Sequence, residues 1–345
     1  MVRVVLLEKL SYRLGPENIA TEPAEVRLGE RDLGRMMVVD RGSGSIRHSS
    51  VLNLPEHLNP GDVVVLNNSK RIPGVLKART HEGAQVELRL TEMGPENSFR
   101  ARAFPAHFVR KGVTLFSKSG ASLKVVRANI KPHSLCELQC DVVVGDLLKG
   151  EGYPITSFFY ANYWNLEHYN PIYASEEGSV ESPMAGLHFT DRLIDRLKSK
   201  GIHVAFVTLH VVGSWLPFLE KDTHGHQAQS EDYFVPDETA RLIRSALRSG
   251  NRVVAVGSTA MRALETSATR KGALKSGAGK SRLFIEPGHE FKLVHSYFTN
   301  FHPARSSLMV LDAAFCPARL LLRAYREARN AHYLFHEFGD AIFYT

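Results

Sequence analysis

The chain of 345 residues is long enough for two domains of ordinary size, and its 43% of hydrophobic residues can supply a substantial core. Its formal net charge of +7 favours an anionic partner such as nucleic acid or a phosphorylated ligand, although basic proteins that bind neither are common. The 3 cysteines form no CxxC pair and no apolar run reaches roughly 18 residues, which argues against a disulfide framework and a membrane partner, so we expect a cytoplasmic protein.

The first fifth of the chain predicts two strands separated by turns. Residues 1–35 show no clear periodicity, whereas residues 35–41 are typical of a buried strand and are followed by a Gly-Ser-Gly turn. Residues 54–62 predict a short helical turn, and residues 62–67 form the clearest strand of this region. The polar loop at 68–73 contains two cations at a strand end, so it could bind an anion or be a solvated turn.

Short segments of alternating polarity, separated by turn residues, fill residues 74–150. No convincing helix interrupts them, and this pattern is typical of a small antiparallel barrel or sandwich. Several of the segments carry Arg or Lys, which indicates either a polyanion-binding face or, more commonly, a solvated strand face. The basic residues are Arg100, Arg102, Arg110, Lys111, Lys124 and Arg127.

The pattern becomes mixed α/β after residue 150. Residues 153–173 are rich in aromatic side chains, for which core packing is a better interpretation than base stacking. Residues 181–190 have neither helical nor strand periodicity and lead into an amphipathic helix at 191–200, with Thr190 as the expected N-cap. A polar, glycine-bearing loop before a capped helix can be an ordinary junction or can hold a functional site.

The second half alternates strands and helices that are bounded by polar loops. The segment at 271–280 is rich in Gly, Lys and Ser, and we expect it to be a mobile basic loop. The other predicted elements are a strand at 203–211, a polar loop at 221–232, a helix at 236–248, a strand at 252–257, a helix at 260–267, a polar loop at 298–307, a helix at 318–330 and a short final strand.

Polar clusters lie at strand or loop ends throughout this α/β part. Because the carboxyl ends of strands bring their following loops to one crevice, we expect these clusters to converge. They contain His188, His210 and His302, which titrate near neutral pH, and Arg262 and Arg305, which can bind anions. Each histidine could equally be a structural polar group. The clusters span residues 181–190, 208–214, 257–262 and 299–307.

The strand, Gly-Ser-Thr turn and helix around residues 257–259 could bind an anion, because the first N–H groups of a helix are free donors. The spacing matches neither a Walker loop nor GxGxxG, so no nucleotide class follows. The pair His224 and His226 is weak evidence for zinc without a third ligand, and we expect no metal. No GxSxG motif supports a serine hydrolase.

Several ordered motifs give the chain a resemblance that runs nearly end to end. They are Ser-Pro-Met-Ala-Gly-Leu-His-Phe-Thr at 182–190, Val-Thr-Leu-His-Val at 207–211, Val-Gly-Ser-Thr-Ala-Met-Arg-Ala-Leu-Glu at 256–265, Thr-Asn-Phe-His-Pro-Ala-Arg-Ser at 299–306 and Tyr-Leu-Phe-His-Glu-Phe-Gly-Asp-Ala at 333–341. With these motifs the chain resembles the S-adenosylmethionine:tRNA ribosyltransferase-isomerase family of queuosine biosynthesis.

The resemblance implies both a fold and a reaction. The implied fold is α/β: a mixed-sheet main domain, residues 1–73 and 151–345, with a small antiparallel β-barrel domain inserted at residues 74–150. The implied reaction transfers and isomerises the ribosyl group of S-adenosylmethionine, a co-substrate, onto 7-aminomethyl-7-deazaguanine at the tRNA wobble position. The product is epoxyqueuosine, with adenine and methionine released, and we expect the enzyme to act as a monomer.

The reaction implies a base that removes a proton from the 5′ carbon beside the sulfonium, and a proton donor for adenine. We assign these catalytic roles to His188, His210 and His302 without deciding which does which. The expected contacts to S-adenosylmethionine are Gly186, Thr190, Gly257, Ser258, Thr259, Arg262 and Asn300, and those to the acceptor are Asn68, Lys70, Glu181 and Arg305.

Departures from the family pattern fall in the expected substrate loops. Glu181 and Ser182 replace an Ala-Ala pair, Gln229 replaces the second histidine of a two-histidine motif, and Val75 replaces an arginine. Two alternatives therefore stay open: a divergent paralogue that uses S-adenosylmethionine on a small-molecule acceptor, and a non-catalytic tRNA-binding protein.

Overall fold

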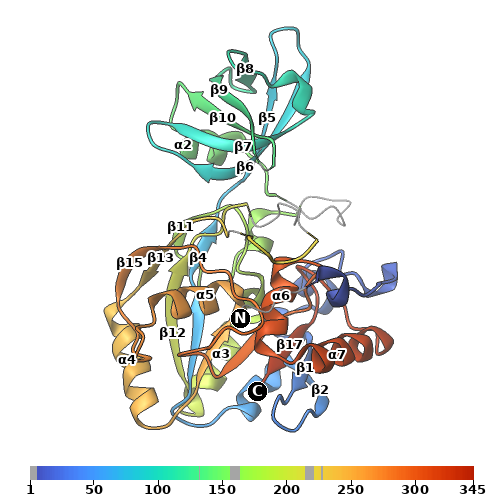
Figure 1. Ribbon diagram of the computed structural model, residues 1–345, viewed down its shortest axis with the longest axis vertical. Helices are drawn as coiled ribbons and strands as arrows, with labels where there is room; N and C mark the ends of the chain where they lie inside the picture. The colour runs from blue at the N-terminus through green and yellow to red at the C-terminus, as the bar shows by residue number, and fades with distance from the viewer. Residues whose placement is uncertain (1–5, 132, 156–163, 214–220, 227) are drawn as a thin grey trace.

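A computed structural model describes residues 6–131, 133–155, 164–213, 221–226 and 228–345. Figure 1 shows a larger α/β body with a smaller β-rich body above it. The larger body contains a 9-stranded mixed sheet, and the smaller one is a closed antiparallel barrel. The predicted fold class, a mixed-sheet α/β body with an inserted barrel, is confirmed.

The large sheet is parallel at its centre and contains antiparallel pairs toward both edges. Strands β3, β12, β14 and β16 run parallel to one another, so their carboxyl ends meet at one edge of the body. The strand order is β15 (Gly277–Ser281), β13 (Glu231–Val235), β12 (His203–Leu209), β3 (Val63–Asn67), β14 (Val253–Val256), β16 (Ser296–Asn300), β17 (Ala341–Tyr344), β1 (Arg35–Val39) and β2 (Ile46–Ser50).

The central strand β3 is apolar on both sides because helices cover both faces of the sheet. Val63 and Val65 pack into the cluster formed with α4 (Asp237–Arg248), α5 (Gly257–Ser267), α6 (Ser307–Phe315) and α7 (Ala318–Asn330). Val64 and Leu66 pack on the opposite side with α3 (Asp191–Ser199) and the 3-10 helix η4 (Val51–His57). The run of branched apolar residues therefore belongs to two cores at once.

The barrel closes in the order β10-β7-β6-β5-β8-β9 around a core of alternating apolar residues that includes Leu88, Leu123 and Leu138. Outside, Arg100 pairs with Glu92 and Glu137, which favours the solvated-face interpretation of this charge over a continuous polyanion surface. The strands are β5 (Val75–Arg79), β6 (Gln85–Met93), β7 (Ser98–Phe104), β8 (Thr114–Ser117), β9 (Ser122–Ile130) and β10 (Leu135–Cys140), and α2 (Val144–Glu151) follows them.

Short elements complete the two bodies. The N-terminal segment, which showed no periodicity, forms η1 (Leu7–Leu10), η2 (Pro16–Asn18), α1 (Ala24–Leu28) and η3 (Arg31–Leu33). The strands β4 (Ser69–Arg71) and β11 (Glu176–Ser179) make a separate 2-stranded sheet, with η5 (Ala106–Phe108), η6 (Leu166–Tyr169) and η7 (Met184–His188) elsewhere. No helix in the described ranges is long and apolar enough to cross a membrane.

The expectation that residues 271–280 form a loop was wrong at its end, because β15 begins at Gly277. This strand reads Gly-Ala-Gly-Lys-Ser, which lacks an apolar pattern, and it is ordered by pairing with β13. The polar loops at 221–232 and 298–307 were also drawn too long, since β13 starts at Glu231 and β16 ends at Asn300. Of the aromatic segment, Tyr169 is buried as expected, and residues 156–163 lie outside the described ranges.

Candidate active site

A cavity of about 640 Å³ lies at the carboxyl ends of the parallel strands, between the barrel and the α/β body. The barrel contributes Arg89 and His133 to its wall, and the main body contributes the rest. Its size is in the range of small-molecule sites. Residues of all the polar clusters line it, from Glu181–Ala185 to Val211–Gly213, Gly257–Arg262 and Thr299–Ser307, so the expected convergence at one crevice is confirmed.

Two helices begin at this cavity. Gly257, Ser258 and Thr259, the first residues of α5, lie on its wall, as do Ser306 and Ser307 at the start of α6. Ser306 is the N-cap of α6 and accepts from the N–H of Met309, whereas no side chain caps α5. The first N–H groups of a helix have no partner within it and form a positive site, so this part of the cavity suits an anion.

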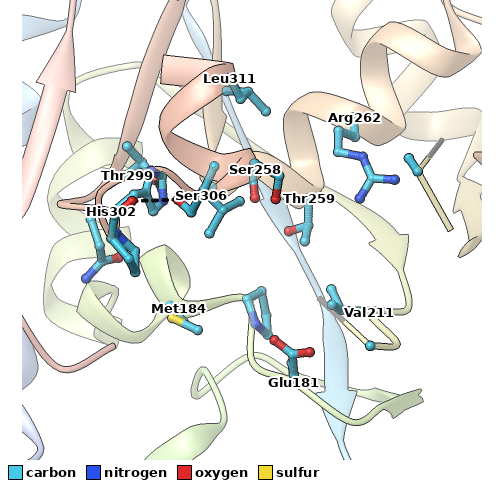
Figure 2. A pocket seen from close by; sticks show the side chains of 18 of the residues that line it. Glu181, Met184, Val211, Ser258, Thr259, Arg262, Thr299, His302, Ser306 and Leu311 are labelled. Carbon is cyan, nitrogen blue, oxygen red and sulfur yellow. Dashed lines mark hydrogen bonds between the residues drawn. The ribbon is translucent and has the colours of Figure 1, made fainter. Parts of the chain in front are cut away.

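His302 lines the cavity and has a defined set of partners. Its Nδ1 lies 2.8 Å from Oδ2 of Asp312, and its Nε2 lies 3.2 Å from Oγ1 of Thr299. Its backbone N–H donates to the hydroxyl of Tyr325 (3.0 Å), which in turn donates to Asp312 (2.8 Å). Because the aspartate holds Nδ1–H, the neutral ring presents a basic Nε2, an arrangement that suits proton transfer. Figure 2 shows Thr299 and His302 on one side of the cavity.

Buried ion pairs form another part of the wall. Arg71 is 1% exposed, pairs with Glu337 (3.2 Å) and donates to Oγ of Ser182 (3.1 Å). Arg262 pairs with Glu231 and donates through Nε to the carbonyl of Leu283 (3.1 Å). Both guanidinium groups are therefore already held by the protein.

A third carboxylate makes this wall acidic. Glu181 is 7% exposed and lies near enough to both Glu231 and Glu337 to raise their pKa values. Burial is the larger cause and raises the pKa of Glu337 to about 7, although Arg71 opposes the shift. Next to Glu337 in the chain, His336 has its pKa lowered to about 4 by burial and by the neighbouring His302. Near neutral pH the wall thus contains a carboxylic acid that keeps its proton, Glu337, and an imidazole that is unprotonated, His336.

Several residues expected in the site line the cavity, and several do not. The lining residues are Glu181, Gly257, Ser258, Thr259, Arg262, Asn300, His302 and Arg305. The others lie elsewhere: His188, His210, Gly186, Thr190, Asn68 and Lys70. Their functional roles stay predictions in both cases.

The residues away from the cavity have structural partners. His210 lies with Nδ1 2.8 Å from Oγ of Ser69, and burial lowers its pKa. Asn68 accepts from Oγ1 of Thr208 (2.7 Å), and Lys70 pairs at the surface with Glu177 (3.7 Å). These contacts hold the segment that follows β3 rather than the cavity wall.

The loop at 181–190 divides into a cavity wall and a packed junction. Its first residues line the cavity, whereas Gly186 lies against Tyr173 so closely that a Cβ there would be 2.1 Å from the hydroxyl. Gly186 is thus required by packing. Thr190 caps α3 as predicted, accepting from the N–H of Leu193 (3.2 Å), and its hydroxyl also donates to Asp32.

The sequence alone did not point to the partners that organise the wall, namely Arg71, Glu231, Asp312, Tyr325, His336 and Glu337. Arg71 was one of the two cations noted after the strand at 62–67, and His336 and Glu337 stand in a quoted motif, so a signal existed for these. Asp312 sits in an apolar helix, where a lone acidic residue is itself a sign of a buried partner. Within the described ranges no group of His, Cys, Asp and Glu side chains could hold a metal ion.

Comparison with known proteins covers almost the whole chain. The family model described as queuosine biosynthesis protein matches residues 7–344. The chain belongs to this family. The match includes both the barrel and the α/β body, so the queuosine biosynthesis family accounts for the complete described architecture.

Named relatives of this family are similar over their full length. The S-adenosylmethionine:tRNA ribosyltransferase-isomerase of Thermotoga maritima is 40% identical over 337 residues, 97% of this chain and 98% of the relative. The enzyme of the same name from Thermus thermophilus is 40% identical over 347 residues, with the same coverage. A crystal structure of S-adenosylmethionine tRNA ribosyltransferase from Thermotoga maritima covers 98% of this chain and 100% of its own, with 34% identity and a TM-score of 0.55.

Proposed function

We propose that the chain is an S-adenosylmethionine:tRNA ribosyltransferase-isomerase, which moves the ribosyl group of S-adenosylmethionine onto 7-aminomethyl-7-deazaguanine in tRNA. The observation that carries the proposal is the shared cavity, where helix amino termini and a buried His302–Asp312 pair meet beside the barrel. Relatives that carry this activity in their names are 40% identical over 97% of the chain, which supports the same reaction here.

S-adenosylmethionine is a ligand of mixed charge, and the cavity offers both signs. Its carboxylate fits the amino termini of α5 and α6, where free N–H groups favour an anion. Its ammonium and sulfonium fit the part of the wall that carries Glu181 and Glu231. Figure 2 shows Ser258 and Thr259 on the opposite side of the cavity from Glu181, so the two kinds of charge face each other.

The chemistry needs a base and an acid in one dry site. A neutral His302 with Nδ1–H held by Asp312 can accept the proton of the 5′ carbon, which is acidic because the adjacent sulfonium stabilises the resulting carbanion. Glu337, whose pKa burial raises to about 7, keeps a proton available near neutral pH and can donate it as adenine leaves. His302 and Glu337 are thus the proposed base and acid.

The acceptor enters from the side of the barrel. A base extruded from tRNA is brought to such a cavity only if the polyanion docks nearby, and the net charge of +7 favours that encounter. Arg89 and His133 are the barrel residues on the cavity wall and would lie nearest the entering nucleotide. We expect the enzyme to work as a monomer in the cytoplasm.

The test is incubation of the protein with S-adenosylmethionine and tRNA bearing 7-aminomethyl-7-deazaguanine, followed by nucleoside mass spectrometry. Epoxyqueuosine with release of adenine and methionine is the expected result. Adenine release without modified tRNA would instead support a paralogue with a small-molecule acceptor. Salt-sensitive tRNA binding without any adenine release would support a non-catalytic tRNA-binding protein.

A further inference from the structure

Asn300, the last residue of β16, leaves one side-chain atom without a partner at the cavity wall. Only 2% of the residue is exposed, and it lines the cavity. Its Nδ2 lies 3.2 Å from Nε2 of His188 and 3.4 Å from the backbone carbonyl of His336. Among the described residues, its Oδ1 accepts no hydrogen bond. A buried acceptor in this state is costly, so a donor supplied by a ligand would be stabilising.

The orientation of this amide is fixed from two directions. The carbonyl of His336 can only accept, so the group that faces it must be the NH₂ of Asn300. Burial lowers the pKa of His188 to about 4, so its ring is neutral at ordinary pH. Since the NH₂ of Asn300 can only donate, Nε2 of the neutral ring must accept from it. Oδ1 is therefore the atom left for a ligand.

His188 itself has no access to the cavity. It is 3% exposed, and its ring packs edge-on against Phe298 with centroids 5.7 Å apart. A Cβ placed on Gly34 would lie 3.6 Å from its Nδ1, which shows how closely η3 and β1 cover it. The void that it borders holds only about 10 Å³. Within the described part of the chain, the hydrogen bond to Asn300 links its ring to the cavity wall.

We propose that Asn300 Oδ1 binds an N–H donor of the substrate, and that His188 is a positioning residue that holds the amide in this orientation. This inference rests on the proposed function, which supplies the candidate donors. They share one chemistry, an amino group: the exocyclic amine of adenine or the ammonium in S-adenosylmethionine, or the aminomethyl group of the acceptor base. The experiment distinguishes these sources.

The decisive variant is Asn300→Leu, which removes the acceptor with little change in volume. Titration calorimetry with S-adenosylmethionine alone measures the contribution of a donor on that ligand. The KM for tRNA bearing 7-aminomethyl-7-deazaguanine measures the contribution of a donor on the acceptor base. A donor on S-adenosylmethionine predicts that Asn300→Leu weakens its binding by about tenfold or more. A donor on the acceptor base predicts unchanged S-adenosylmethionine binding and a tRNA KM raised by about the same factor.

A substrate analogue locates the donor within S-adenosylmethionine. The analogue that carries hypoxanthine in place of adenine lacks the amino group. If that amine is the donor, the wild-type protein binds the analogue weakly, and Asn300→Leu costs nothing further. If Asn300→Leu weakens binding of the analogue by the same factor as binding of S-adenosylmethionine, the ammonium is the donor.

His188 is tested by a pair of variants. His188→Gln offers a carbonyl oxygen to the NH₂ of Asn300 and is expected to keep most of the affinity. His188→Leu cannot accept and is expected to resemble Asn300→Leu, with affinity or KM changed more than kcat. His48→Gln, at an exposed histidine of β2, is the matched control and is expected to behave as wild type.

Each outcome decides the inference. Asn300→Leu with unchanged S-adenosylmethionine affinity and unchanged tRNA KM, in a protein that makes product, would overturn it while leaving the proposed function intact. A large loss of kcat in both His188 variants at constant affinity would make His188 catalytic and overturn its positioning role. A folded wild-type chain that neither binds S-adenosylmethionine nor modifies tRNA would reject the proposed function and this inference together.

Discussion

Nδ1 of His302 and Oδ2 of Asp312 lie 2.8 Å apart, and both side chains are buried, with His302 on the cavity wall. The aspartate also accepts from the hydroxyl of Tyr325, so its position is fixed by two donors. An aspartate placed in this way selects the tautomer of the histidine and stabilises the ring once it is protonated. The pair is the centre of the proposed proton transfer.

Asp312→Asn is expected to lower kcat by about 10²-fold or more, because the amide can no longer hold the productive tautomer of His302. The affinity for S-adenosylmethionine should change little. Single-turnover measurement of adenine release, with calorimetry for binding, checks this. Asp195→Asn, on the exposed face of α3, is the matched control. Full activity in the Asp312 variant would remove the pair from the mechanism.

Thr190→Ala is expected to destabilise the fold because the hydroxyl caps α3 through the N–H of Leu193, a contact that typically contributes about 1 kcal/mol. It also loses the contact to the buried Asp32, so the upper end of the usual range is expected, about 2 kcal/mol. Urea unfolding measures the difference. Thr190→Ser retains the oxygen and should stay close to wild type, and equal losses in the two variants would contradict the capping role.

As the pH falls from about 6.5 to about 4, the contribution of His188 to the stability of the protein should fall. Its folded-state pKa lies near 4, so between about pH 4 and 6.5 this histidine is protonated in the unfolded chain but not in the folded protein. The full effect is roughly 3 kcal/mol and is complete below the folded pKa. Glu337 acts in the opposite sense, since its raised pKa favours the folded state as the pH falls below about 7.

Urea unfolding across this pH range in wild type and in His188→Gln separates the two effects, because Glu337 is common to both proteins. The difference in unfolding free energy between them should shift in favour of the variant as the pH falls. Parallel curves would show that His188 titrates normally in the folded state.

Gly186→Ala is expected to destabilise by about 1–3 kcal/mol, since the new methyl would lie 2.1 Å from the hydroxyl of Tyr173. Removing that hydroxyl in a Tyr173→Phe background should recover part of the loss, which makes the pair a double-mutant cycle. Gly145→Ala in α2 is the control, because its Cβ meets no atom within 4 Å and alanine favours a helix. Thermal unfolding measures all of these, and additive losses would contradict the contact.

Local patterns in the sequence predicted the elements whose own residues carry the signal. The all-apolar run of β3 and the apolar stripe of α4 need no distant partner to be recognised. β15 was missed because its Gly-Ala-Gly-Lys-Ser sequence becomes a strand only through its pairing with β13. β16 was missed because the polar residues at its carboxyl end masked a short, fully buried strand.

The candidate site divides in a similar way. The convergence of loops at one crevice followed from strand direction alone, and Glu181, Arg262 and His302 were placed on the wall by that argument. The pairing of Arg71 with Glu337 joins residues 266 positions apart, and no local pattern contains it. For His188 the two signals differ: its chemistry suits a catalytic role, whereas packing places it outside the cavity, and its role stays a prediction.

The chain enters and leaves the barrel at neighbouring points. The N–H groups of Gly74 and Val75 both donate to the carbonyl of Tyr153 (3.0 and 2.9 Å), and the N–H of Tyr153 donates back to Val75 (2.8 Å). Because the two crossing segments are already paired, a tight turn could join them without moving the strands on either side. The barrel is therefore an exchangeable insertion. A different small domain joined at the same point would give the cavity a different wall and allow it to bind different substrates.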